Sequence, residues 1–263
     1  MTKRMRIYLI IDETRFYHPG FVSDFLKKTT DEVVGGGLVT RVPSRSSIDH
    51  YLRTHWYYLK PSEMAKLAVR KYTMAIKDLV LKRDLNSPFY SVRSVFEFFK
   101  IDFMEVRYDI NQQTYIDRIK EKEPDVIVSS NSLIFKGEVI GIPKICCLNR
   151  HSALLPSYGG LWPVFQAYRR GEEYTGVSVH VMERKIDTGH VLAQRKIRIE
   201  KKDTIADLYD KCFTISADVV IAALEKVRKG DFTLCSGGYE SSYFSFPVRE
   251  HWQEFRERGG RFI

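Results

Sequence analysis

Short apolar segments alternate with helical patterns over the first 150 residues, and this alternation limits the fold more than any other feature of the sequence. The apolar segments are continuous runs rich in β-branched residues, which is typical of strands covered on both faces. Because helical patterns separate these runs, we predict an α/β, Rossmann-like fold with a mostly parallel sheet and helices on both faces.

The same patterns give the individual elements. We expect strands over residues 4–11, 33–39, 103–108, 126–129 and 144–148, and a strand pair over 176–182 and 191–199. We expect helices over residues 21–28, 92–99, 114–121 and 162–170, a basic helix between 41 and 83, and a long helix from 203 or 204 to about 229. After Gly230 the composition shifts toward aromatic residues, Ser and Gly. We therefore predict one domain over residues 1–230 and a short C-terminal extension over 231–263 packed on it.

The composition is that of an ordinary globular protein, with 44% hydrophobic and 29% charged residues. The basic N-terminus precedes a short apolar run that ends at Asp12, so we interpret this run as a first strand rather than a signal peptide. No window approaches the length of a membrane-spanning helix. The four cysteines form no C-x-x-C pair, and the histidines lack the spacing of a metal site. We therefore expect reduced thiols, a cytoplasmic location and no metal.

The formal charge of +9 is concentrated between Arg41 and Arg83, where ten Lys and Arg residues accompany three acidic ones. Because apolar residues in this segment follow helical spacing, we expect one helix face to pack and the other to be basic. The basic face is either a solvated surface or attracts an anionic ligand: a diphosphate, a nucleic acid or an acidic membrane surface. The apolar residues are Met64, Leu67, Ala68, Tyr72, Ala75, Ile76, Leu79 and Val80.

The stretch Cys147–Pro163, CLNRHSALLPSYGGLWP, has the character of a site. Asn149 and His151 are two residues apart, so they share one face of an extended strand. A proline and two glycines follow and force an irregular path directly after them. Individually, Asn149 could satisfy a loop backbone and His151 could be a hydrogen-bonded core histidine.

A carboxylate completes a catalytic interpretation. Asp187 lies in an Asp-Thr-Gly turn between two predicted strands. An amide and an imidazole can stabilise an oxyanion, the imidazole can move a proton near neutrality, and a carboxylate can orient it. The set suits acyl transfer to an amine. No protein nucleophile is evident, because Ser152 lacks a nucleophile elbow and neither Cys146 nor Cys147 has a partner, so we favour direct attack by the substrate's amine.

These residues belong to a longer pattern. Its members, in order, are Asn149-Arg150-His151, Leu154-Leu155-Pro156, Tyr158-Gly159-Gly160, Gly176-Val177-Ser178-Val179-His180, Asp187-Thr188-Gly189 and Gln194. Over roughly residues 125–230 the pattern resembles the 10-formyltetrahydrofolate-dependent formyltransferases, the family whose fold is shared by the N-terminal part of methionyl-tRNA formyltransferases. One departure is Ala153, which stands where the family usually has a serine.

The resemblance implies roles for residues and a co-substrate. Asn149 and His151 would hold the formyl oxygen, His151 would relay the proton of the attacking amine, and Asp187 would orient His151 and assist the departing folate nitrogen. The pterin of 10-formyltetrahydrofolate would lie beside the segment Ser129–Phe135. We take the following members of that segment as its binding residues: Ser130, Asn131, Ser132, Leu133 and Ile134.

The resemblance leaves several amine acceptors. We expect neither the methionyl-tRNA enzymes, because too few residues follow Gly230 for their C-terminal domain, nor the glycinamide ribonucleotide enzymes, because no glycine-rich phosphate loop follows the first strand. The remaining branch acts on nucleotide-linked amino sugars, for example a dideoxy-aminohexose for lipopolysaccharide O-antigen. The basic segment would then serve the diphosphate. We take Tyr158, Gly159, Gly160 and Trp162 as the substrate-binding residues.

Two other readings are left open. A nucleic-acid-binding protein would use the basic segment and the arginines and aromatics near the C-terminus, but it leaves Asn149, His151 and Asp187 unexplained. A catalytically silent relative would only sense folate. We expect no nucleic-acid partner, and the sequence leaves a homodimer open.

Overall fold

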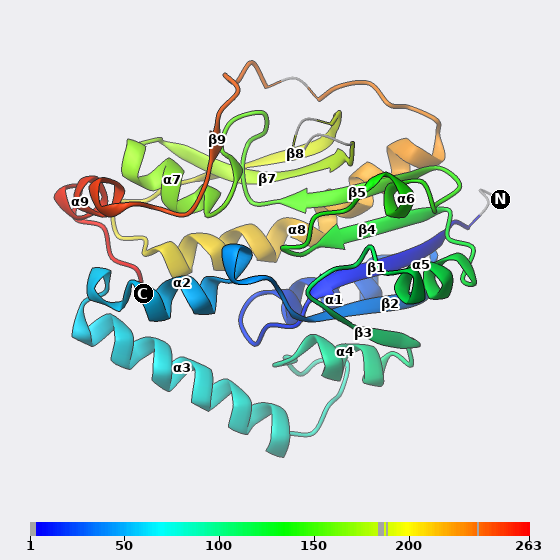
Figure 1. Ribbon diagram of the computed structural model, residues 1–263, viewed down its shortest axis with the longest axis horizontal. Coiled ribbons are helices and arrows are strands. Elements are labelled where there is room, and N and C mark those ends of the chain that lie inside the picture. Colours follow the sequence, from blue (N-terminus) through cyan, green and yellow to red (C-terminus); the bar gives the residue numbers. More distant parts are fainter. Residues whose placement is uncertain (1–3, 184–186, 188, 236) are drawn as a thin grey trace.

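A seven-stranded sheet forms the centre of the protein (Figure 1). The computed structural model describes residues 4–183, 187, 189–235 and 237–263. Among these, the strand order is β3-β2-β1-β4-β5-β7-β8; β1 to β5 are parallel, whereas β7 and β8 run antiparallel to their neighbours. The strands are β1 (Arg6–Asp12), β2 (Glu32–Arg41), β3 (Phe103–Arg107), β4 (Val126–Ser130), β5 (Cys146–His151), β7 (Tyr174–Val181) and β8 (Val191–Arg198). The prediction of a mostly parallel α/β sheet is confirmed.

Helices cover both faces of the sheet, as Figure 1 shows. Their α-helical segments are α1 (His18–Lys28), α2 (Ile48–Thr54), α3 (Pro61–Val80), α4 (Val92–Phe98), α5 (Gln113–Lys120), α6 (Gly137–Ile140), α7 (Pro163–Arg170), α8 (Ile205–Arg228) and α9 (Arg249–Glu257). Short 3-10 turns lie at Ser44–Ser46 and Trp56–Tyr58. The short helices α2 and α6 were not anticipated from the sequence.

Two hydrophobic cores lie on opposite faces of β1. Alternate residues of a strand point to opposite faces. Leu9 therefore joins the core with α1, α4 and α8, whereas Ile10 joins the core with α5 and α6. Both side chains are essentially inaccessible to solvent. This two-sided burial explains why β1 is continuously apolar.

The connections reverse direction at β1. The chain passes from β1 through α1 to β2 on one side, and returns from β3 through α5 to β4 on the other side. Open α/β sheets bind ligands in the crevice at such a switch point, outside the carboxyl ends of the strands. Here that point lies after Asp12 and Ser130.

The C-terminal segment after α8 returns to the domain. Its strand β9 (Tyr243–Phe244) pairs with β6 (Gly159–Gly160), and α9 packs against α7 (Figure 1). Trp252 and Phe255 of α9 are buried against Phe165 of α7. The extension thus shares the core of the main domain.

The basic segment differs from the sequence prediction in one respect. Helix α3 forms, but apolar side chains expected to pack are exposed: Tyr72 to 70% and Leu79 to 86%. On its inner side α3 is held by charged contacts instead, because Arg70 pairs with Asp210 of α8 at 3.0 Å. The expectation that the apolar face of this helix packs is therefore wrong.

A buried carboxylate joins the start of α3 to the C-terminus. Glu63 accepts hydrogen bonds from Arg256, from the backbone N–H of Phe262 at 2.7 Å and from the N–H of Lys60 at 2.9 Å. Burial would raise the pKa of Glu63, but these donors outweigh it and the pKa lies below its ordinary value. The charged form therefore stabilises the fold.

We expect Glu63→Gln to lower the free energy of unfolding by about 2–4 kcal/mol at neutral pH, because Arg256 loses its charged partner. Since the pKa of Glu63 is lower in the folded state, its stabilisation is complete above the ordinary value of 4.5 and is lost as the pH falls through the folded-state pKa. Urea unfolding should therefore show the difference between wild type and variant shrinking in acid. The exposed control Glu225→Gln should change little; equal stabilities for wild type and Glu63→Gln at neutral pH would contradict the assignment.

Candidate active site

The antiparallel pairing of β5 with β7 brings two sequence motifs together. In its register Asn149 lies opposite His180, and His151 lies opposite Ser178. Asn149 and His151 share a face because they are two residues apart. The Asn-x-His motif and the Gly-Val-Ser-Val-His motif therefore meet at the carboxyl end of β5.

A polar chain runs from Asn149 through His180 to Asp187. The Nδ1 of His180 lies 2.9 Å from the Val181 carbonyl, which can only accept, so Nδ1 carries a hydrogen. In the neutral ring Nε2 is then an acceptor, and the Asn149 amide donates to it at 3.2 Å. Asp187 Oδ1 lies 3.5 Å from the same nitrogen. One amide hydrogen of Asn149 is used here, which leaves its second hydrogen for another acceptor.

His151 is held as a neutral base with a defined tautomer. Burial lowers its pKa, and the charge of Asp187 opposes this shift without cancelling it. Its Nε2 lies 3.0 Å from the Tyr158 carbonyl, so Nε2 carries the hydrogen and Nδ1 is the basic nitrogen. Among the described residues, no hydrogen bond to this Nδ1 is formed.

Asp187 is held as a carboxylate. Burial would raise its pKa, but the positive charge that His151 and His180 carry when protonated, together with the Gly160 N–H, which donates to Oδ2 at 2.8 Å, outweighs it, and the pKa lies well below the usual range. The sequence predicts that Asp187 orients His151. In the described residues the Tyr158 carbonyl supplies the orienting bond, and Asp187 acts on His151 through its charge.

The Tyr158-Gly159-Gly160 segment, predicted to bind substrate, supports the catalytic side chains. Gly160 has a φ of +88°, and a Cβ there would lie 2.1 Å from the Phe244 carbonyl, so only glycine fits. The Tyr158 ring is buried and stacks on Phe244, and its hydroxyl donates to Glu172 at 2.5 Å. Substrate contact by this segment stays a prediction.

Trp162, also predicted to bind substrate, is placed in an aromatic cluster. Its side chain is 5% exposed and contacts the rings of Phe165, Trp252 and Phe262. This surrounding supports a packing role for Trp162, and its contact with substrate stays a prediction.

Two further motif residues fix the Leu-Leu-Pro loop. The Ser178 hydroxyl donates to the Ala153 carbonyl at 2.6 Å and accepts from the Leu155 N–H at 3.0 Å. Gln194 donates to both Ser178 and the Leu155 carbonyl, at 2.8 and 3.0 Å. These buried bonds explain why Ser178 and Gln194 belong to the same sequence pattern as the loop.

The predicted cofactor segment lies at the switch point. Ser132 donates to Asp12 of β1 at 2.9 Å, and Asn131 donates to the Ile10 carbonyl at 3.0 Å. Burial raises the pKa of Asp12 to about 7, although the hydrogen bonds from Ser132 lower it. Its Oδ1 is buried and without a hydrogen-bond partner among the described residues.

The other predicted cofactor residues differ in exposure. Ser130 is buried and its hydroxyl lies 3.2 Å from Nε2 of His18. Leu133 is 8% exposed, and its N–H donates to Asn131. Ile134 is 47% exposed, so it is open to contact with a ligand.

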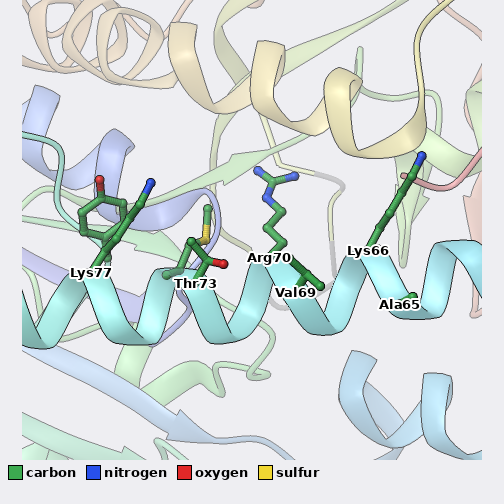
Figure 2. Close-up of a pocket in the computed structure, with 8 residues that line it drawn as sticks. Ala65, Lys66, Val69, Arg70, Thr73 and Lys77 are labelled. Atoms are coloured by element: carbon green, nitrogen blue, oxygen red, sulfur yellow. The ribbon is translucent and has the colours of Figure 1, made fainter.

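A basic cavity of about 450 Å³ lies beside α3. Figure 2 shows Lys66, Arg70 and Lys77 projecting from one side of the helix around it. The guanidinium of Arg70 packs over the rings of Phe16 and Tyr17, in the loop between β1 and α1. This loop joins the cavity to the carboxyl end of β1.

Sequence reasoning assigned no role to two residues of this region. His180 was part of the motif, but its place between Asn149 and Asp187 depends on the strand register. Asp12 was interpreted only as the end of a strand. The feature that could have identified it is a carboxylate directly at the end of a buried apolar run. Within the described ranges, no group of three His, Cys, Asp or Glu could hold a metal ion, and no helix is long and apolar enough to cross a membrane.

Comparisons with known proteins identify the family of the chain. The model of the family described as Formyl transferase matches residues 76–224. Methionyl-tRNA formyltransferase of Borrelia duttonii (strain Ly) is 35% identical over 137 residues, which are 52% of this chain and 44% of that protein. The match therefore spans less than half of that relative's length.

Solved structures share the fold. Glycinamide ribonucleotide transformylase 1 from Symbiobacterium toebii matches with a TM-score of 0.58 at 15% identity, over 86% of this chain and 89% of that chain. A sugar N-formyltransferase from Shewanella sp FDAARGOS_354 matches with a TM-score of 0.56 at 14% identity, over 96% and 87%. At such identities the likeness shows the fold alone.

We expect Asp187→Asn to lower the pKa of His151 further, because the carboxylate is the charge that opposes the effect of burial. Long-range proton–nitrogen NMR spectra of the histidine rings should show the hydrogen on Nε2 and report the titration, with His151→Gln identifying the signal. An Nδ1–H tautomer, or a pKa that rises in Asp187→Asn, would contradict the geometry.

Proposed function

The chain belongs to the formyl transferase family, and from this premise we propose that it moves a formyl group from 10-formyltetrahydrofolate to a primary amine. The observation that carries the proposal is the assembly of Asn149, a neutral His151 and an ionised Asp187 at the carboxyl end of β5. It combines an oxyanion donor, a basic nitrogen and a fixed negative charge.

The residues divide the work of acyl transfer. As the substrate amine attacks the formyl carbon, the second amide hydrogen of Asn149 would donate to the developing oxyanion. Nδ1 of His151 would accept the proton that the amine loses, and would return it to the folate nitrogen as the bond to that nitrogen breaks. Asp187 would stabilise the imidazolium that exists between these two transfers.

No protein nucleophile is needed for this route. Cys146 and Cys147 lie at the start of the same strand, but burial raises the pKa of Cys146 to about 12 and raises that of Cys147 as well. A thiol in such surroundings is inert. Direct attack by the amine therefore fits the chemistry of the strand.

For the folate we propose the switch point between β1 and β4, beside Ser130–Ile134. Asp12 has one buried carboxyl oxygen there that finds no partner within the described part of the chain. A pterin carries ring N–H and amino donors that would satisfy such an oxygen. Exposed Ile134 offers an apolar contact for its ring system.

For the acceptor we propose a nucleotide-linked amino sugar. The end of β1 carries Asp12 and Glu13, which would repel a phosphate at that point. The cavity lined by Lys66, Arg70 and Lys77 would attract a phosphate through its positive charges. It adjoins the loop between β1 and α1, because Arg70 packs over Phe16 of that loop. A sugar N-formyltransferase shares the fold over 96% of this chain, so the fold is compatible with such an acceptor.

Methionyl-tRNA is the second candidate acceptor. Its support is the 35% identity to the Borrelia duttonii enzyme and the positive charge of the segment 41–83. The same Asn149, His151 and Asp187 chemistry would serve either amine, so the choice concerns binding and not the reaction.

We expect Asn149→Ala to reduce kcat by about 10²–10³-fold, because one oxyanion donor is lost. The assay is transfer of formyl from 10-formyltetrahydrofolate, followed as tetrahydrofolate release. The exposed Asn86→Ala is the control and should keep its kcat. A kcat of Asn149→Ala near that of wild type would contradict the assignment of this residue.

We expect a nucleotide-linked amino sugar to gain a formyl group, detected by mass spectrometry in a panel that also contains methionyl-tRNA and glycinamide ribonucleotide. Removing both lysines in Lys66→Ala/Lys77→Ala should raise KM for the sugar by about tenfold with little change in kcat. The control Lys144→Ala/Lys229→Ala removes the same charge elsewhere and should leave KM for the sugar unchanged. Product from methionyl-tRNA alone would reject the sugar while keeping the reaction.

A further inference from the structure

Helix α3 exposes an apolar stripe to solvent. All twenty residues of α3 are described, and only Glu63 among them is buried. The exposed fractions of the large apolar side chains are high, at 65% for Val69, 70% for Tyr72, 61% for Ile76, 86% for Leu79 and 66% for Val80. A soluble helix normally turns such residues toward its own core.

These side chains share one side of the helix. At about 100° per residue, the five fall within a sector of roughly 100°. Met74, which is partly buried, lies on the opposite side. In Figure 1, α3 (cyan) is the outermost element along the lower edge. The stripe is open to solvent, and Val69 at its edge also lines the basic cavity.

Lysines flank the stripe on both sides. Lys66 and Lys77 lie within about 60° of the edge on the side of the basic cavity, and Lys71 lies about 80° beyond the other edge. Lys82 follows just after the helix. The segment 41–83 carries ten basic and three acidic residues. Exposed aromatic side chains precede the helix at Trp56 and Tyr57.

This combination favours an anionic surface over a second copy of the chain. Pairing two α3 helices would bring their flanking lysines together, at an electrostatic cost. A helix with an apolar stripe, a Lys-rich polar face and nearby Trp and Tyr is suited to the interface of a bilayer, with the lysines at the headgroups. Anionic headgroups add attraction for each lysine.

We propose that α3 is a membrane-surface helix, which places the domain on bilayers rich in anionic lipid through the stripe Val69, Tyr72, Ile76, Leu79 and Val80 and the lysines beside it. The helix would lie in the interface plane without crossing the bilayer. The inference does not depend on the reaction, and its test uses Lys71 and Lys82, which do not line the cavity proposed for the acceptor.

The test is co-sedimentation of the full chain with phosphatidylcholine vesicles, with and without phosphatidylglycerol. We expect binding to the anionic vesicles only, weakened by salt. Ile76→Gln/Leu79→Gln should weaken it by about tenfold or more because the apolar insertion is lost. Lys71→Gln/Lys82→Gln should weaken it by about tenfold or more because two headgroup contacts are lost.

Matched controls change the same chemistry elsewhere. Ile145→Gln/Leu234→Gln alters two other exposed apolar residues, and Lys144→Gln/Lys229→Gln removes two other lysines; both should bind like wild type. Because all these positions are exposed, the variants should fold, which circular dichroism checks. Absence of binding to anionic vesicles, or equal binding by the stripe variants, would overturn the proposal. A third outcome would also overturn it: light scattering shows a wild-type dimer, Ile76→Gln/Leu79→Gln is a monomer, and neither protein binds vesicles. The stripe would then bind a second copy of the chain.

Discussion

The pairing of β5 with β7 is the contact on which the site depends. A slip of one residue would turn Asn149 away from His180 and would remove Ser178 from the Leu-Leu-Pro loop. The register is secured because Ser178 is fully buried and its hydroxyl is satisfied by donors and an acceptor from the loop and from Gln194. One antiparallel pair therefore fixes both the catalytic side chains and the loop beside them.

Burial then separates the charge states of two neighbouring groups. His151 loses its charge more readily than in water because it is buried, whereas Asp187 keeps its charge because the Gly160 N–H donates to it and a neighbouring imidazole, once protonated, attracts it. A neutral base beside a permanent negative charge is prepared for proton transfer, since the imidazolium is stabilised only when it forms. The glycine turn is part of this arrangement: Gly160 supplies the N–H and Tyr158 the carbonyl that set both side chains.

The sequence was sufficient to predict the features of the fold that depend on a local pattern of residues. Continuous apolar runs predicted the central strands, and the spacing of Asn149 and His151 predicted a shared face, because both follow from the strand repeat of two. It was insufficient where a partner lies far along the chain. The pairing of β6 with β9 and the bond from Gly160 to Asp187 join segments separated by many residues. For Trp162, an aromatic pattern could not tell a core position from a ligand contact.

Helix α3 shows the limit of such patterns most directly. Its apolar residues repeat as those of a core-facing helix do, and the sequence predicted packing, yet the structure turns them outward. The inner side is held by ion pairs, Arg70 with Asp210 and Arg15 with Asp78, and by buried Glu63 at its start. An amphipathic repeat predicts that a helix has an apolar side, but it does not predict which surface covers that side. Where the protein's own core is already complete, as it is between α1, α4 and α8, the apolar side is left for a surface outside the chain, and the lysines beside it set the charge that surface must carry.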